Sequence, residues 1–89
     1  MTYTLTIWYF EFAKDVMLKE SVETEHKLKF KSIEEAKSYA TNKAYSYFDD
    51  LNRVVVTIKN ESDNFLGLRL EEKAGEARYG CSAFLKKDK

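Results

Sequence analysis

The sequence contains no proline, three glycines and one cysteine among its 89 residues. Without proline every strand keeps its backbone donors, and turns must be built from Asn, Asp, Ser and Lys. One cysteine excludes an internal disulfide, and because small secreted domains usually carry several, a reducing cytoplasm is favoured. No apolar run approaches the roughly 18 residues of a membrane-spanning helix, and no basic signal-peptide start is present. We therefore expect a cytoplasmic protein without a membrane segment.

The chain also lacks an excess of either charge, since 15 Lys and Arg residues balance 15 Asp and Glu residues. This neutrality argues against a general nucleic-acid-binding protein and equally against a highly acidic nucleic-acid mimic. Aromatic residues, in contrast, make up 15% of the sequence. They supply large buried areas in a chain that is long enough for one core only. We expect a single compact domain over residues 1–89.

One segment, residues 32–51, has a clear helical period. Ser32 and Glu35 have the spacing of a capping box, in which the Ser32 hydroxyl accepts a hydrogen bond from the Glu35 backbone N–H. Seven residues then fall within an arc of roughly 120° on a helical wheel. They are Ile33, Ala36, Ala40, Ala44, Tyr47, Phe48 and Leu51. The pattern predicts a helix with one face in the core.

Five segments have the alternation of apolar and polar residues that is typical of strands: 2–12, 17–31, 53–59, 65–73 and 76–85. Lys14 and Asp15 are the expected hairpin tip, and residues 86–89 are expected to form a frayed tail. In the second segment the predicted core face is Leu18, Val22, Thr24, His26, Leu28 and Phe30. In the third segment it is Val54, Val56 and Ile58. The apolar faces of the other segments are Tyr3, Leu5 and Ile7 in the first, Leu66, Leu68 and Leu70 in the fourth, and Ala77, Tyr79, Cys81, Ala83 and Leu85 in the fifth.

This order of elements, ββαβββ, predicts an α+β fold with two layers. We expect a mainly antiparallel five-stranded sheet with the single helix packed across one face. Because the helix follows the second strand, it should make a crossover to the third. A single helix covers one face of the sheet, so the other face is the first place to seek a function.

The first strand becomes apolar on both faces after Ile7, because Trp8, Phe10 and Phe12 replace the threonines at even positions. These aromatics should lie on the uncovered face, where Phe65 and Phe84 are able to join them. An exposed aromatic cluster is typical of a surface for a partner or for self-association. The alternative is that the same residues form a small second core.

Two further groups are candidates for contacts. Tyr39 and Tyr45 flank the helical stripe, where tyrosines are usually boundary residues and less often partner-binding anchors. Lys27, Lys29 and Lys31 line the polar face of the second strand and are candidate phosphate contacts. Glutamates interrupt this stripe, so nucleic acid is an alternative partner that the sequence does not favour.

Residues for catalysis or for binding a cofactor are few. His26 and Cys81 are the only histidine and cysteine, and no third group is identifiable that would orient a base. No residues have the spacing of a zinc or calcium site. The three glycines match no phosphate-binding loop. We therefore predict no catalytic residue, no metal and no cofactor.

The whole chain resembles the small phage-encoded inhibitors of bacterial defence, of which anti-CRISPR proteins are the best known. The resemblance lies in the capped helix SIEEAKSYA between a strand pair and a strand triple, the aromatic excess and the missing catalytic set. It implies a compact domain that blocks a larger protein or nucleoprotein partner, such as a bacterial defence complex. Neutral charge departs from the acidic DNA-mimicking members, so inhibition would depend on shape and aromatic contact.

These observations favour a non-enzymatic protein-binding module, an inhibitor in which Trp8, Phe10 and Phe12 are anchors within a polar rim of Lys and Glu. One alternative is a small nucleic-acid-binding regulator that uses the lysines of the second strand. Another is a homodimer that closes two open sheets on each other.

Overall fold

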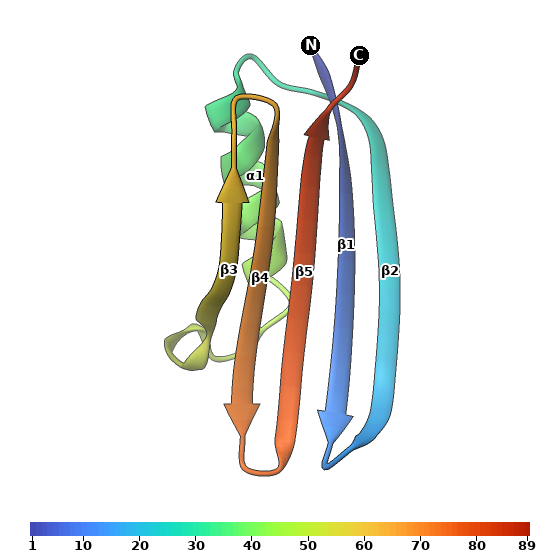
Figure 1. Ribbon diagram of the computed structural model, residues 1–89, viewed down its shortest axis with the longest axis vertical. Coiled ribbons are helices and arrows are strands. Elements are labelled where there is room, and N and C mark those ends of the chain that lie inside the picture. Colours follow the sequence, from blue (N-terminus) through green and yellow to red (C-terminus); the bar gives the residue numbers. More distant parts are fainter.

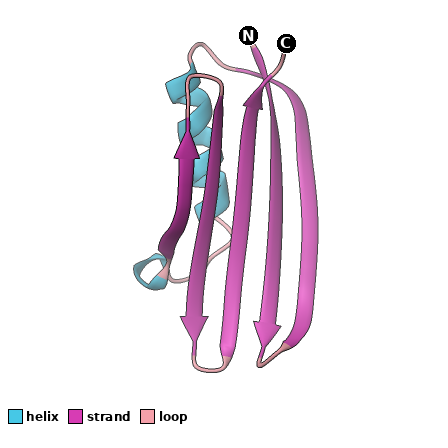
Figure 2. Cartoon of the chain, viewed as in Figure 1, coloured by secondary structure: helices cyan, strands magenta, loops and turns pink.

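The computed structural model describes residues 1–89, which form one five-stranded sheet and one α-helix (Figures 1 and 2). The α+β fold and the order ββαβββ are confirmed. The elements are β1 (Thr2–Ala13), β2 (Val16–Lys29), α1 (Ile33–Tyr45), a 3₁₀ turn η1 (Leu51–Arg53), β3 (Val55–Glu61), β4 (Phe65–Ala74) and β5 (Ala77–Lys87).

The strand order is β2-β1-β5-β4-β3, and every neighbouring pair is antiparallel. The edge strands are therefore β2 and β3, and the connection through α1 crosses behind the sheet from one edge to the other (Figure 1). Because β1 and β5 are neighbours, both chain ends lie at the same end of the sheet. This arrangement brings together segments that are far apart in the sequence.

The core lies between α1 and the three central strands. Ala36, Ala40 and Ala44 are fully buried, and these small side chains let the helix approach the sheet closely. The helix begins as predicted, with the Ser32 hydroxyl accepting from the Glu35 N–H at 3.2 Å. The inward faces predicted for β1, β4 and β5 are confirmed. They supply Tyr3, Leu5, Ile7, Leu66, Leu68, Leu70, Cys81, Ala83 and Leu85.

The helix is shorter than predicted, because it ends at Tyr45. At about 1.5 Å per residue its 13 residues span roughly 20 Å, whereas the molecule is 42 Å long. Phe48 remains in the core, where its ring lies 6.1 Å from that of Tyr9. Leu51 is 56% exposed, so its place in the helical stripe was wrong. The Asp50 carboxylate caps η1 by accepting from the Asn52 N–H, and this new turn interrupts the helical period.

The predicted core face of β2 is correct only near its end. Leu28 and Phe30 pack against the core, but Leu18, Val22, Thr24 and His26 are exposed. A β-bulge is the cause: Tyr3 pairs with Leu28 while Leu5 pairs with Glu25, so β2 has one extra residue there. Within the bulge Lys27 has a φ of 55°. One added residue exchanges the two faces of the strand as far as Lys19. A second shift follows there, because Glu11 pairs with Lys19 while Phe12 pairs with Met17.

As a result, Glu23 and Glu25 face the helix layer and bind it through polar contacts. The Tyr39 hydroxyl donates to Glu25 at 2.7 Å, and the Tyr47 hydroxyl donates to Glu23 at 2.7 Å. Lys43 pairs with both carboxylates. The hydrogen bond from Tyr47, followed by that from Lys43, lowers the pKa of Glu23. Burial, followed by the bond to Glu23, raises the pKa of Tyr47 to about 12.

Strand β3 is likewise more exposed than predicted. Val54 packs partly against the core, but Val56 is 47% and Ile58 is 50% exposed. A bulge in β3 lies between Val56 and Ile58 and places them on opposite faces of the sheet. The inward set of three residues was therefore wrong, because β3 is an edge strand with an irregular register.

The C-terminal residues belong to the sheet. Strand β5 continues to Lys87, whose N–H donates to the Asn64 carbonyl at 2.8 Å. The hydroxyls of Thr2 and Thr4 each donate to the Asp88 carboxylate at 2.8 Å. These two hydrogen bonds lower the pKa of Asp88. The expectation of a frayed tail over residues 86–89 was wrong for residues 86–88, because β1 and β4 supply their partners.

Candidate functional site: the open face of the sheet

The open face is the side of the sheet opposite α1, and the viewer of Figure 1 looks onto it. Strand β1 presents Trp8, Phe10 and Phe12 on this face, at positions that alternate with the buried Ile7 and Tyr9. The structure thus places the predicted aromatics opposite the helix. Phe84 on β5 shares this face because it pairs with Thr6 of β1, and paired residues point to the same side of the sheet. Phe65 on β4 shares it as well, because it pairs with Lys86, which in turn pairs with Thr4.

Phe10 forms a small second core on the open face and is only 5% exposed. Its ring lies over Gly80 of β5, where an added Cβ would meet the Phe10 Cζ at 2.1 Å. The Arg69 guanidinium lies 5.2 Å from the centre of the ring on the β4 side. The role of Phe10 as an exposed anchor is therefore corrected: Phe10 supports the surface from below.

Trp8 and Phe12 flank Phe10, with ring centres at 4.8 Å and 5.4 Å from it, and both are half-buried. The indole Nε1 of Trp8 donates to the Glu20 carboxylate at 2.9 Å. The Arg78 guanidinium lies 5.6 Å from the centre of the Phe12 ring. Both aromatic side chains are therefore held in place before any partner binds.

Exposed side chains of β2 extend this surface to the edge of the sheet. Val22 lies opposite Trp8 and is 65% exposed, and Leu18 is 62% exposed. Met17 lies opposite Phe12 and is 43% exposed. We call these five residues the apolar end: Trp8, Phe12, Met17, Leu18 and Val22. The bulge at Lys27 creates this surface, because it turns Val22 and Leu18 away from the core.

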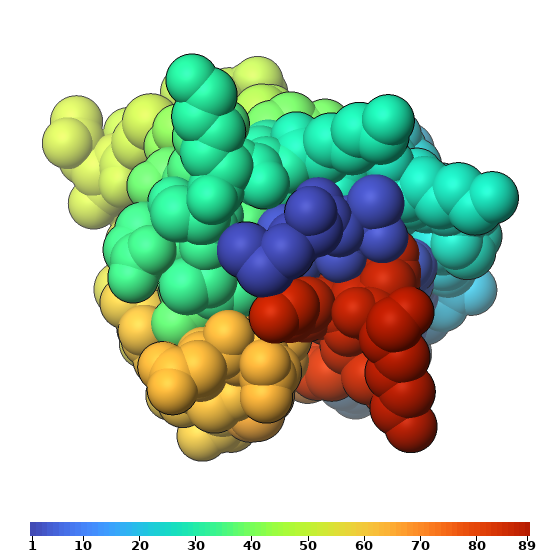
Figure 3. Space-filling view, turned by 90° about the horizontal axis from the view of Figure 1, so that it is seen from above, coloured from blue at the N-terminus to red at the C-terminus, as the bar shows by residue number.

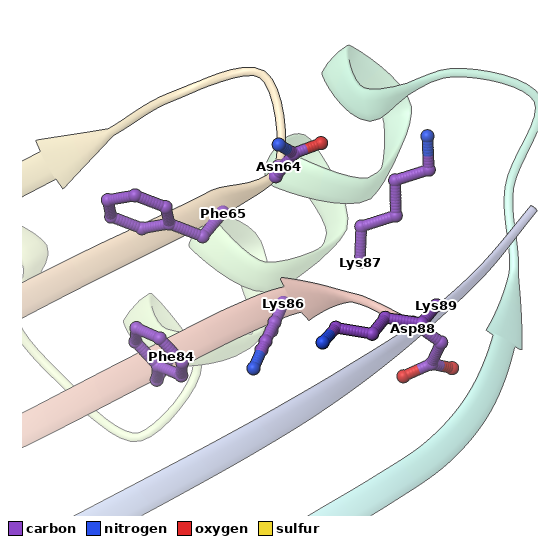
Figure 4. A pocket seen from close by; sticks show the side chains of 7 residues that line it. All are labelled: Asn64, Phe65, Phe84, Lys86, Lys87, Asp88 and Lys89. Atoms are coloured by element: carbon purple, nitrogen blue, oxygen red, sulfur yellow. The ribbon is translucent and has the colours of Figure 1, made fainter.

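The other two predicted aromatics form a separate pair near the chain ends. The rings of Phe65 and Phe84 are stacked, with centres 6.1 Å apart, and Phe84 is 49% exposed. Figure 4 shows Lys86 extending to the same side of β5 as Phe84, whereas Lys87 extends to the other. A shallow hollow of about 400 Å³ lies between these side chains and Lys89.

The predicted lysine stripe of β2 does not form. Lys29 lies on the open face opposite Thr2, but Lys27 is in the bulge and Lys31 lies beyond the end of the strand. Strand order instead brings Lys29 to the same end of the sheet as Lys86 and Lys89. Figure 3 shows the N-terminal residues between the C-terminal residues and the chain near residue 30. We call Lys29, Lys86 and Lys89 the basic end.

The strands of the open face carry more positive than negative charge. From the register we assign five cationic residues and two carboxylates to its strands, and Asp88, which follows β5 and accepts from Thr2 and Thr4 of this face, adds a third carboxylate. The whole chain is neutral, so the remainder carries an excess of carboxylates. The cations are Lys29, Arg69, Lys73, Arg78 and Lys86, and the carboxylates of the strands are Glu20 and Glu71.

The remaining predicted groups lie elsewhere. Tyr39 and Tyr45 are half-buried in the helix layer, away from the open face. Cys81 is fully buried beneath α1, and burial raises its pKa to about 11. His26 is exposed on the edge strand, so the structure does not bring it to Cys81. No three His, Cys, Asp or Glu side chains gather where they could hold a metal ion.

None of the helices has the length and apolar character needed to cross a membrane. Comparisons with protein-family models, with curated proteins and with solved structures find no match.

Proposed function

We propose that this protein is a non-enzymatic, cytoplasmic protein-binding module that docks the apolar end of its open face onto a larger protein. The observation that carries the proposal is the group of exposed apolar side chains beside Trp8 and Phe12. Val22 lies opposite Trp8, whose indole is already fixed by Glu20, and Leu18 and Met17 follow beyond Glu20 along β2, with Met17 opposite Phe12. Exposed apolar side chains gathered in this way mark interaction sites on small proteins.

Trp8 and Phe12 are the anchors in this proposal. Both are rigid aromatics held by neighbours, so little side-chain entropy is lost when a partner covers them. Tryptophan and arginine are the residues most often responsible for interface energy, and Arg78 adjoins Phe12. The hydrogen bond from Trp8 to Glu20 and the cations beside the rings form a polar rim that sets orientation.

The charge of the open face favours a particular kind of partner. Because cations outnumber carboxylates on it, the complementary surface is apolar at its centre and acidic around it. A second copy of the same face does not fit this description. When two open faces stack about a two-fold axis parallel to the strands, the basic end of one copy lies against the basic end of the other. When the axis is perpendicular to the strands, the basic end of one copy lies over the apolar end of the other. We therefore favour a different protein over a homodimer.

An inhibitory role follows from the resemblance to anti-CRISPR proteins. A small domain that covers an essential surface of a bacterial defence complex needs no chemistry of its own. The buried Cys81 and the distant His26 are consistent with a protein that acts by occupying space. In this proposal the partner loses activity because the domain blocks its access to substrate or nucleic acid.

The test uses the protein as bait in a lysate of the native host, with two matched variants. Val22→Glu places a carboxylate within the apolar end, and Leu51→Glu places one at an exposed apolar site outside the sheet. We expect wild type and Leu51→Glu to capture the same protein, and Val22→Glu to lose it. The captured protein is then purified and its function measured with and without the domain.

Equal capture by both variants contradicts the proposed surface. Light scattering at about 100 µM provides the second check, because a large isologous interface should hold a dimer together at that concentration. A dimer that Val22→Glu dissociates would mean that the apolar end binds a second copy of the chain.

A further inference from the structure

The basic end has chemistry that a protein-docking surface does not require. Lysines from two separate segments lie at this end of the open face, with β1 between them. Lys29 comes from the end of β2, and Lys86 and Lys89 come from the C-terminal residues. Phe65 and Phe84 are stacked beside them on the same face. The sequence as a whole is neutral, so this concentration of cations arises from the strand order.

The Phe84 ring is the most exposed aromatic surface of the molecule, at 49%. Its neighbour across β1 is Thr6, and the next residue along the face is Thr4. Gly67 of β4 lies beside the ring without crowding it, since an added Cβ would stand 3.8 Å from the Phe84 Cδ2. A flat ligand therefore has open access to one face of the ring, with hydroxyls and ammonium groups at its margin.

We propose that the basic end binds single-stranded nucleic acid. An unpaired base stacks on Phe84, while Lys29, Lys86 and Lys89 contact the flanking phosphates. Exposed aromatic rings on an open sheet, bordered by cations, are the combination that holds unpaired bases without sequence preference. A duplex offers no free base face to the ring. This site lies at the opposite end of the open face from the apolar end, so it does not depend on the protein-binding proposal.

One acidic side chain lies among the residues that line the hollow. Asp88 accepts hydrogen bonds from Thr2 and Thr4, and these lower its pKa, so the carboxylate is charged at neutral pH. Its charge opposes a bound phosphate. Asp88→Asn retains an oxygen that accepts a hydrogen bond and removes the charge. We therefore expect this variant to bind nucleic acid more tightly than wild type.

The probe is a fluorescein-labelled oligothymidylate of about 12 nucleotides, within the range of about 4–16 that single-strand-binding folds occupy. Binding is measured by fluorescence anisotropy on the full chain. Three phosphate contacts, at about −0.7 each in the slope of log K against log salt, predict roughly a twentyfold loss of affinity between about 50 and 200 mM salt.

Two variants separate stacking from charge. Phe84→Leu keeps an apolar side chain and removes the ring, and we expect binding to weaken at least about fivefold. Lys86→Gln should weaken binding and reduce the salt slope by about 0.7. Val22→Glu at the apolar end is the matched control and should leave binding unchanged. Its loss of the captured protein, with oligonucleotide binding intact, distinguishes the two sites.

Four results overturn the proposal. They are no binding at about 50 mM salt, equal binding by Phe84→Leu and wild type, equal or tighter binding of a duplex of the same length, and displacement by polyglutamate at the same charge concentration. The last result assigns the basic end to an acidic protein segment.

Discussion

The replacement Gly80→Ala tests the packing on which the open face depends. Phe10 occupies the space above Gly80, and an added Cβ would stand 2.1 Å from the Phe10 Cζ. The methyl group and the ring cannot both remain, so the ring must leave its buried position. Fully burying a phenylalanine is worth about 1.5–3 kcal/mol, whereas Gly→Ala within a strand gains about 0.5–1 kcal/mol. We expect a net destabilisation of about 1–2 kcal/mol.

The assay is urea unfolding followed by the fluorescence of Trp8, the only tryptophan, whose ring centre is 4.8 Å from that of Phe10. In a domain of this size, 1 kcal/mol corresponds to about 4–8 °C in the melting temperature. Gly67→Ala is the control, because its Cβ would meet nothing closer than 3.8 Å. That variant should be more stable than wild type by about 0.5–1 kcal/mol.

A double-mutant cycle isolates the contact between position 80 and the ring. In a Phe10→Ala background the obstruction is absent, so Gly80→Ala should then stabilise the protein by about 0.5–1 kcal/mol. A Gly80→Ala protein that is as stable as Gly67→Ala would contradict this packing, since Phe10 would then not occupy the space above β5.

Two further predictions concern β2 and its attachment to the helix. Lys27→Gly should stabilise the protein by roughly 0.5 kcal/mol, because Lys27 has a φ of 55° in the bulge. A left-handed conformation costs a non-glycine residue about 1–2 kcal/mol, and the larger backbone entropy that glycine loses on folding offsets about 0.5–1 kcal/mol of the gain. Lys29→Gly, in the regular part of the strand, should instead destabilise it, and equal effects in thermal unfolding argue against the bulge. Because the pKa of Tyr47 is raised to about 12 in the folded state, its contribution to stability is complete below about pH 10 and is lost as the pH rises from there towards 12. Tyr47→Phe should weaken this alkaline loss in urea titrations, and an unchanged pH profile would show that Tyr47 is not responsible.

Periodicity predicted the faces of β1, β4 and β5 because alternation runs unbroken through their buried residues. Its failures lie in β2 and β3, the two edge strands, and each failure coincides with a bulge. A glycine often marks the left-handed residue of a bulge, but here that residue is Lys27, which gives no such signal. The reversal of the face that carries Val22 was therefore not visible in the sequence.

The candidate site was predicted in kind and not in detail. The sequence predicted which face of the sheet carries the aromatics, because Trp8, Phe10 and Phe12 occupy even positions of the first strand and the core residues occupy odd positions. The burial of Phe10 depends on Gly80, which lies opposite it only because β5 is the neighbour of β1. The basic end was missed for the same reason, since Lys86 and Lys89 were assigned to a tail. Strand order is a property of the whole fold, and no local pattern encodes it.

The most direct test of the central claim is a calorimetric titration of the captured, purified partner with wild type, Trp8→Ala and Leu51→Glu. Loss of an anchor at an interface costs about 2 kcal/mol or more, which is a factor of about 30 in Kd. We predict at least this loss for Trp8→Ala, with Leu51→Glu binding as tightly as wild type. Equal affinities for all three proteins would contradict the assignment of the apolar end as the binding surface.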